Sequence, residues 1–189
     1  LTKRINKTRK YRLRNLYESI YETDDNQIIL ELDGDDYLKD EFVLARLNQL
    51  YQINKYLLVH CNYKNNPPEI AKKYGYGTFS QKTPWSTQKL AAFRKYPWIY
   101  SGLRSYYSWL FKKIKKEDLI FDNQFSPVCC DVASMLPMLE MAPQRIGYVQ
   151  EELLIRNIDS PINEFKVITD EQVKIRQLIL NKKPYEKIA

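Results

Sequence analysis

The stretch that most constrains this chain is residues 27–40, QIILELDGDDYLKD, in which an apolar run ends abruptly in acidic residues. Three carboxylates, those of Asp33, Asp35 and Asp36, surround the single glycine Gly34. A short β-branched apolar run that ends in Asp and Gly predicts a buried strand followed by a tight turn. The pattern therefore places three acids at the carboxyl end of a buried strand, where open α/β sheets bind their ligands.

Acidic side chains at such a turn suit a hard divalent cation. Mg²⁺ and Mn²⁺ take oxygen ligands and often carry substrate phosphates into a site. We therefore expect Mg²⁺ or Mn²⁺ as the cofactor, with Asp33, Asp35 and Asp36 as the metal ligands. The alternative is an acidic turn that is merely solvated, and these residues by themselves favour neither interpretation.

Length and composition indicate a single globular domain over residues 1–189. The chain is 44% hydrophobic and 13% aromatic, which is enough to build a sizeable core. No apolar run reaches the roughly 18 residues that cross a bilayer, and we recognise no signal peptide. The chain begins with Leu1 rather than with a methionine, so we expect that an upstream segment has been lost.

The cysteines and the single histidine disfavour several kinds of site. Cys61, Cys129 and Cys130 have no metal-ligand spacing, and the adjacent pair bridges to itself only with strain. Reduced thiols in the cytoplasm are the simplest interpretation. Because His60 is the only histidine, a zinc site or a Ser–His–Asp triad is disfavoured.

The net charge of +7 is unevenly distributed along the chain. Seven Lys and Arg residues precede the first acid, Glu18, and a second basic cluster comprises Lys112, Lys113, Lys115 and Lys116. Such clusters fit nucleic acid, anionic lipid, a diphosphate or a merely solvated helix face. No nucleic-acid motif is recognised, and the acidic turn repels phosphate without a metal, so we expect no nucleic-acid partner. Peripheral contact with a membrane surface stays open.

The spacing of apolar residues predicts alternating helices and strands. Helices are predicted for 9–21, 40–53, 86–95, 102–114, 129–141 and 170–180, and strands for 27–32, 56–60, 146–149 and 153–155. The order strand, helix, strand over residues 27–60 favours a parallel βαβ unit in an α/β fold. Residues 61–84 are predicted to be irregular, and such a long stretch is usually a functional or mobile loop. Residues 121–128 are predicted to be a loop that leads to the helix at 129–141.

Two stretches carry a more specific signal: residues 27–51 and residues 129–163, which begins CCDVASMLPMLEM. Together with YSWLFKKI at 107–114, they resemble the family-2-type glycosyltransferases of GT-A architecture over most of residues 7–166. In that family an Asp-x-Asp motif at a strand end binds a divalent metal and the nucleotide sugar. A later acid that opens a helix serves as the general base. Asp33-Gly34-Asp35 matches the motif, and Asp131 matches the base.

The resemblance implies a GT-A-like, Rossmann-type mixed sheet flanked by helices in one domain. It also implies a metal-dependent, hexosyltransferase-like enzyme that moves a sugar, with inversion, to a hydroxyl of a glycan or other acceptor. The expected donor is a nucleotide-diphosphate sugar, and a UDP-sugar is the first candidate. Asp131 would accept the acceptor's proton, while Asp33, Asp35, Arg14 and Asn15 would bind the donor.

The sequence departs from the family pattern in three respects. The family opens with a strand, helix and strand that receive the base of the nucleotide, and this sequence starts after most of that unit. Arg14 occupies a position where relatives have a small residue, and Cys130 replaces an acid that many relatives carry before the base. The alternative function is therefore a catalytically degenerate, GT-A-like binding or scaffold protein.

Other residues compete for roles in such a site. Glu140 lies nine positions after Asp131, so one small site cannot hold both, and we predict that Glu140 pairs with a nearby Arg or Lys. His60 either contacts substrate or is a half-buried, hydrogen-bonded side chain. The candidates for positioning the acceptor are the loop 62–84 and three aromatic residues, Trp98, Tyr100 and Trp109. These aromatic residues are also candidates for the core.

Overall fold

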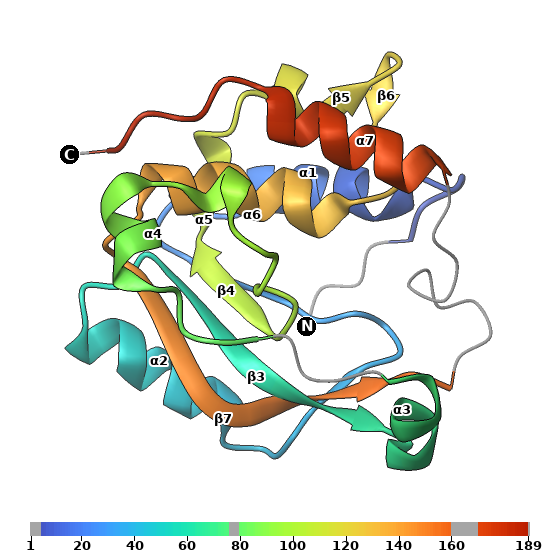
Figure 1. Ribbon diagram of the computed structural model, residues 1–189, viewed down its shortest axis with the longest axis vertical. Coiled ribbons are helices and arrows are strands. Elements are labelled where there is room, and N and C mark those ends of the chain that lie inside the picture. Colours follow the sequence, from blue (N-terminus) through green and yellow to red (C-terminus); the bar gives the residue numbers. More distant parts are fainter. Residues whose placement is uncertain (1–4, 76–79, 160–169, 189) are drawn as a thin grey trace.

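The computed structural model describes residues 5–75, 80–159 and 170–188, in which a curled mixed sheet lies between helices (Figure 1). The strand order in this five-stranded sheet is β1-β4-β3-β7-β2, and β5 and β6 form a separate ribbon. The strands are β1 (Ile28–Glu31), β2 (Tyr37–Leu38), β3 (Leu58–Asn66), β4 (Arg104–Tyr107), β5 (Ile120–Phe121), β6 (Gln124–Phe125) and β7 (Ile146–Asn157). The predicted α/β class, with a mixed sheet flanked by helices in one domain, is confirmed.

The strand directions agree with the predicted βαβ unit. Among the described strands of the large sheet, β3 and β7 are parallel, whereas β1–β4, β4–β3 and β2–β7 are antiparallel pairs. Because β1 and β3 are both antiparallel to β4, they run in the same direction with β4 between them. The carboxyl ends of β1 and β3 therefore lie at the same edge of the sheet as the amino end of β4.

Helices cover both faces of the sheet. The helices are α1 (Tyr11–Tyr21), α2 (Val43–Ile53), α3 (Pro68–Tyr74), α4 (Trp85–Leu90), α5 (Ser108–Lys112), α6 (Cys130–Met141) and α7 (Asp170–Asn181), with 3₁₀ turns η1 (Phe93–Lys95) and η2 (Lys116–Leu119). Helix α2 packs on one face, and α1, α5 and α6 pack on the other, with α7 beyond α6 (Figure 1). No helix in the described parts of the chain is long and apolar enough to span a membrane.

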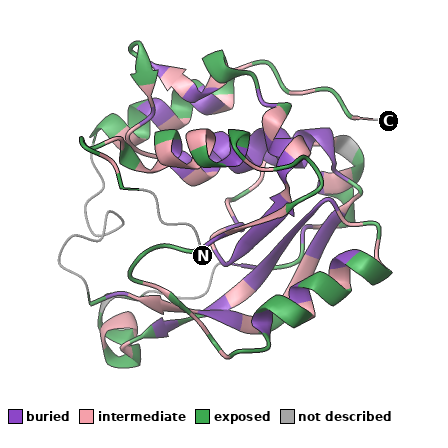
Figure 2. Ribbon diagram, turned by 180° about the vertical axis from the view of Figure 1, so that it is seen from behind, coloured by how far each residue is buried: buried purple, intermediate pink, exposed green. Residues whose placement is uncertain are grey.

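The two helical layers enclose two hydrophobic cores. The smaller core joins Val43, Leu47 and Tyr51 of α2 to the sheet, and the larger one surrounds α6. Every residue of α6 from Val132 to Met141 is buried, because the helix lies between the sheet and α7. Figure 2 shows the buried residues running along the strands and through α6. A helix enclosed in this way is expected to be apolar on all sides, which explains the sequence of this run apart from Ser134 and Glu140.

Residues 102–114 do not form the single helix that their spacing predicts. Arg104–Tyr107 form β4, and Ser108–Lys112 form the short helix α5. Strand β4 fills the position between β1 and β3 and pairs with both. Two neighbouring strands offer hydrogen bonds to the backbone on either side, and this tertiary pairing outweighs a local helical pattern.

Three other predicted boundaries are wrong. Residues 61–66 continue β3 instead of starting an irregular stretch, and α3 follows them; residues 76–79 lie outside the described part. The predicted closing pair of strands is the single strand β7, whose register with β3 shifts near Asn62. Residues 121–128, predicted as a loop, contain β6. In the first two cases, the pairing of β3 with the distant β7 extends each strand beyond what the local sequence indicates. In the third case, β6 pairs with the neighbouring β5 in a short hairpin.

Candidate functional site

The acidic turn after β1 borders a small polar cavity of about 120 Å³. Its walls come from α1, the end of β1, the start of β4, the first turn of α6 and the far half of β7. The lining residues are Arg12, Glu31, Asp33, Asp36, Ser101, Gly102, Arg104, Asp131, Leu154 and Arg156. The fold thus gathers four carboxylates and three arginines at the edge of the sheet where β1 and β3 end.

Glu31, the last residue of β1, is the buried centre of this charged group. Its side chain is 3% exposed. Arg12 donates to Oε2 at 2.8 Å, the Nη2 atom of Arg104 lies 3.5 Å from the same oxygen, and the Tyr106 hydroxyl donates to Oε1 at 2.8 Å. A buried carboxylate is costly unless it is paired, and here three partners compensate it. Glu31 therefore holds both arginines at the cavity.

Arg12 stays charged although it is partly buried. Burial opposes its charge, but the carboxylates of Glu31 and Asp33 outweigh this effect and raise its pKa above the ordinary value for arginine. The distance from Arg12 Nη2 to Asp33 Oδ1 is 3.2 Å. Arg12 consequently ties the first turn of α1 to the acidic turn.

The three acids of the turn occupy different environments. Asp33 and Asp36 both line the cavity, and the backbone N–H of Asp36 donates to the Asp33 carbonyl at 3.1 Å to close the turn. Asp36 Oδ1 accepts a hydrogen bond from the backbone N–H of Asn157 at 2.9 Å. Asp35 is exposed and does not line the cavity. The structure thus brings two of the three predicted metal ligands to the cavity.

Asp36 is a partly buried acid among like charges. Burial raises its pKa to about 6, and the charges of Asp33 and Asp35 add to the rise, while the Asn157 N–H acts against it. Carboxylates that repel one another at a half-buried turn favour the binding of a cation.

Replacing Asp36 by Asn is expected to stabilise the protein, without added metal, at pH 7 but not near pH 4. Its pKa is raised from 3.8 to about 6, so between these values the folded protein binds more protons than the unfolded one and its stability falls as the pH rises. Asn removes the charge and keeps an acceptor for Asn157. We expect a gain of about 1–2 kcal/mol, reduced by solvent screening of the group. Urea unfolding at pH 7 and pH 4 measures this change in the free energy of unfolding, with Asp24→Asn as the control. A change of equal size at the two pH values would contradict this expectation.

Asp131 lies in the first turn of α6 and faces the cavity. The residue before the helix, Cys129, has a φ angle of 54°, and this left-handed conformation turns the chain into α6. Asp131 Oδ1 accepts from the Val132 N–H at 2.9 Å, and Oδ2 lies 3.7 Å from Arg104 Nη1. Its side chain is 29% exposed. Asp131 is thus an accessible carboxylate, connected to Glu31 through Arg104.

The predicted donor residues Arg14 and Asn15 do not line this cavity. Arg14 donates to Glu18 at 2.9 Å along the exposed face of α1, and Asn15 accepts from Asn6 at 2.7 Å. Residues two positions apart on a helix face different directions, so Arg12 reaches the cavity and Arg14 does not. A role for Arg14 and Asn15 in binding the donor stays a prediction.

The two rivals of Asp131 have other surroundings. Glu140 is fully buried, its Oε2 accepts from Arg94 at 2.9 Å and from the Tyr185 N–H at 3.0 Å, and its Oε1 also accepts from Arg94. The prediction that Glu140 pairs with an arginine is confirmed. His60 is fully buried, and neither ring nitrogen has a hydrogen-bond partner within the described residues, so the prediction of a half-buried, hydrogen-bonded histidine is wrong.

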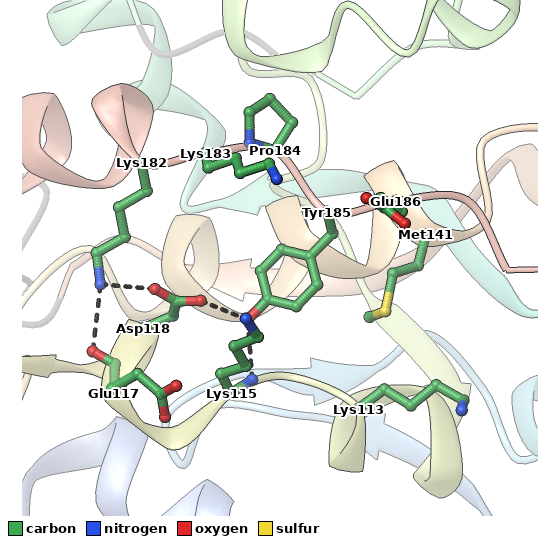
Figure 3. Close-up of a pocket in the computed structure, with 10 residues that line it drawn as sticks. All are labelled: Lys113, Lys115, Glu117, Asp118, Met141, Lys182, Lys183, Pro184, Tyr185 and Glu186. Carbon is green, nitrogen blue, oxygen red and sulfur yellow. Dashed lines mark hydrogen bonds and ion pairs between the residues drawn. The ribbon is translucent and has the colours of Figure 1, made fainter.

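A larger hollow, about 720 Å³, lies beneath the C-terminal segment (Figure 3). Two of its charged groups form an ion pair: Lys182 lies 3.2 Å from Asp118, and the Tyr185 hydroxyl also donates to Asp118 at 2.6 Å. Lys113 and Lys115 of the basic cluster also line it. Lys112 bonds to Asp25 at 2.8 Å instead. Because these groups are exposed or paired, we assign the chemistry to the smaller cavity. Membrane contact through the basic cluster stays a prediction.

Sequence reasoning missed four charged residues at the cavity: Arg12, Glu31, Arg104 and Arg156. One signal was available, because Glu31 interrupts an apolar strand with a charge that a buried strand tolerates only when it is paired. Arg104 lay in a segment that was predicted to be helical. No local pattern distinguishes Arg12 or Arg156 from the other basic residues of this chain.

The cavity residues fit a divalent cation that is held partly by its substrate. In the parts of the chain that the structure describes, no group of three or more His, Cys, Asp or Glu side chains is arranged to hold a metal. Mg²⁺ is commonly bound by one or two carboxylates, with substrate phosphates and water completing its coordination. Asp33 and Asp36 offer such a pair, and their mutual repulsion would be relieved by a cation.

The described architecture is similar to a glycosyltransferase fold. The crystal structure of S. aureus TarS residues 1–349, in complex with UDP-GlcNAc, matches with a TM-score of 0.57 and 14% sequence identity. The match covers 88% of this chain and 44% of the TarS chain, so it spans less than half of that neighbour. At this identity the likeness shows the fold alone. No protein-family model matches the chain, and no curated protein matches it in sequence.

Proposed function

We propose that this chain is a glycosyltransferase domain that moves a sugar from a nucleotide-diphosphate donor to an acceptor hydroxyl. A UDP-sugar is the first candidate for the donor. The observation that carries the proposal is the convergence of Asp33, Asp36 and Asp131 on one cavity that three arginines also line. Two acids come from the turn after β1, and the third comes from the first turn of α6. This separation suits two tasks, one at the diphosphate and one at the acceptor.

The donor side of the site is the acidic turn. Mg²⁺ or Mn²⁺ would be held by Asp33 and Asp36, with the charge of Asp35 nearby, and would neutralise the leaving diphosphate. Arg12 and Arg156 add positive charge to the same cavity. Buried Glu31 fixes the position of Arg12, so this charge is organised before the donor binds.

The acceptor side of the site is Asp131. As the acceptor oxygen bonds to the anomeric carbon, the bond from that carbon to the diphosphate oxygen breaks, and the acceptor's proton passes to Asp131. Arg104, 3.7 Å from Asp131, orients this carboxylate. The family resemblance implies a single displacement with inversion.

Replacing Asp33 by Asn is expected to weaken Mn²⁺-dependent UDP binding at least about tenfold, because a carboxylate at the metal is lost. Titration calorimetry with UDP, with and without Mn²⁺, measures the effect in the full-length protein, including any residues before Leu1. The matched control is Asp24→Asn, an exposed acid in the turn before β1. Unchanged Mn²⁺-dependent binding in Asp33→Asn would mean that the acidic turn is merely solvated.

The alternative is a catalytically degenerate binding or scaffold protein, and the size of the cavity favours it. A volume of about 120 Å³ is below the range of roughly 300–1,000 Å³ that small-molecule sites usually have. A transferase therefore needs the cavity to widen when the donor enters. An assay of sugar transfer separates the two functions, since a scaffold binds without turnover.

A further inference from the structure

A row of four polar side chains crosses the sheet beside the cavity. The strand register pairs Glu31 of β1 with Arg104 of β4, Arg104 with His60 of β3, and His60 with Tyr148 of β7. Residues opposite one another in neighbouring strands project from the same face, so these four side chains follow one another across the sheet. The preceding row on this face is apolar and packs in the larger core: Ile29, Tyr106, Leu58 and Ile146.

The two ends of this polar row differ in their hydrogen bonding. At the cavity end, Glu31 is fully compensated by its neighbours. Toward the other end, next to Tyr148, His60 is completely buried, and both of its ring nitrogens lack a partner in the described structure. The rings of Tyr100 and Tyr148 flank it at 4.9 and 5.1 Å. Burial lowers the pKa of His60 to about 3, so at neutral pH the ring offers one donor and one acceptor.

Other buried polar atoms near His60 share this lack of partners. Within the described residues they include Ser80 Oγ, Trp98 Nε1 and, next in the row, Arg104 Nε; Ser80 is linked to His60 through Tyr148, and Trp98 through Tyr100. Trp98 packs on Tyr100 at 5.3 Å, and Tyr100 in turn contacts His60. Buried polar groups are nearly always paired, so several unpaired groups at one place indicate a polar partner that binds there.

The segment 80–101 covers this end of the row. The Tyr148 hydroxyl donates to the Ser80 carbonyl at 3.3 Å, and Ser101 and Gly102 continue directly into the cavity wall. The chain lies so close to β3 at Gly102 that an added Cβ would be 1.8 Å from the Cys61 carbonyl oxygen and 2.9 Å from Ser80 Oγ. The unpaired groups therefore adjoin the proposed transfer site and are separated from solvent by this segment.

We infer that His60, Ser80 and Trp98 form a binding subsite for a sugar ring beside the cavity. A sugar hydroxyl both donates and accepts, so a few hydroxyls satisfy a neutral imidazole, a serine hydroxyl and an indole N–H together. The rings of Tyr100 and Trp98 provide apolar faces for the C–H groups of the sugar. Because this subsite is assigned within the proposed transferase, its ligand is the sugar of the donor or that of the acceptor. Tyr100 and Ser80 must shift to admit it.

The chain itself provides a reporter for this subsite, since His60 is its only histidine. In protein labelled with ¹³C-histidine, we expect the ring signals of His60 to shift with UDP-GlcNAc or with free GlcNAc or glucose, but not with UDP alone. The titration uses Mg²⁺, which does not broaden the spectra, and free sugars up to about 50 mM, enough to populate a weak site. A shift with UDP-GlcNAc alone identifies the donor sugar, and a shift with a free sugar in the presence of UDP identifies the acceptor sugar.

No shift with any sugar or nucleotide sugar would overturn the subsite and leave buried water as the partner of His60. This outcome is distinct from failure of the proposed function. If UDP does not bind with metal but free sugar shifts His60, the transferase proposal fails and the subsite stands. If UDP binding depends on Asp33 and no sugar shifts the His60 signals, the transferase proposal stands and the subsite fails.

A pair of variants provides a second test. His60→Leu removes the unpaired polar atoms, so we expect it to be at least as stable as the parent and to weaken sugar binding about tenfold or more. The control Tyr51→Phe removes a buried hydroxyl that bonds Ser105 on the opposite face of the sheet. Saturation-transfer NMR with GlcNAc and glucose, together with UDP-GlcNAc titration, measures both variants. Binding by His60→Leu equal to that of the parent would contradict the subsite.

Discussion

Replacing Asp131 by Asn is expected to slow sugar transfer at least ~100-fold and to leave donor affinity almost unchanged. Asn keeps the shape of the side chain and an oxygen that accepts from the Val132 N–H, but it cannot take the proton of the acceptor hydroxyl. A positioned general base typically contributes about 10²–10⁴-fold to rate. Transfer from a panel of UDP-sugars, measured beside the affinity for each of them in Mn²⁺, separates the two effects.

The control for this experiment is Asp24→Asn, which removes an exposed acid remote from the cavity lining and should transfer at the parental rate. The full-length protein is used, so that any residues before Leu1 are present. Near-parental transfer by Asp131→Asn would show that the proton goes to another group. Absence of transfer by the parent itself, with every nucleotide sugar tried, would favour the scaffold.

Replacing Glu140 by Gln is expected to reduce the free energy of unfolding by about 3–5 kcal/mol, because Arg94 loses the charge that compensates it in a buried position. The Glu140 side chain is 0% exposed and that of Arg94 is 12% exposed. Arg94 also donates to the carbonyl of Ile179, so the pair links α6 to the end of α7. Urea unfolding measures the loss.

The double variant Arg94→Met with Glu140→Met tests the origin of this loss. If the cost comes from an uncompensated charge, the double variant recovers part of the stability that Glu140→Gln loses, since neither charge remains. A loss below about 1 kcal/mol in Glu140→Gln would contradict the assignment of a buried ion pair. Asp131→Asn should therefore change mainly the transfer rate, whereas Glu140→Gln should change mainly the free energy of unfolding.

The acids illustrate how far local sequence predicts this site. The acidic turn was predicted because an apolar β-branched run, an Asp and a Gly are local signals for a strand end. Asp131 was placed at the start of a helix by the family resemblance, and α6 begins at Cys130, one residue before it. The acidic turn and Asp131 meet in one cavity because of β4, and the sequence pattern predicted a helix where this strand lies. Strand β4 contributes Arg104, the residue between Glu31 and Asp131.

By itself, the sequence determined the elements whose signals are local: the strand and acidic turn at 27–36, the helices predicted for 40–53 and 129–141, which are α2 and α6, and the α/β class. The tertiary structure alone decided which residues of distant segments come into contact. Arg12, Glu31, Arg104 and Asp131 come from four different elements, and their charges compensate one another only after the sheet has formed. The row that leads to His60 likewise exists only through the register of β1, β4, β3 and β7. Periodicity reports which face of an element is buried, whereas strand order and register are set by pairing across the whole chain.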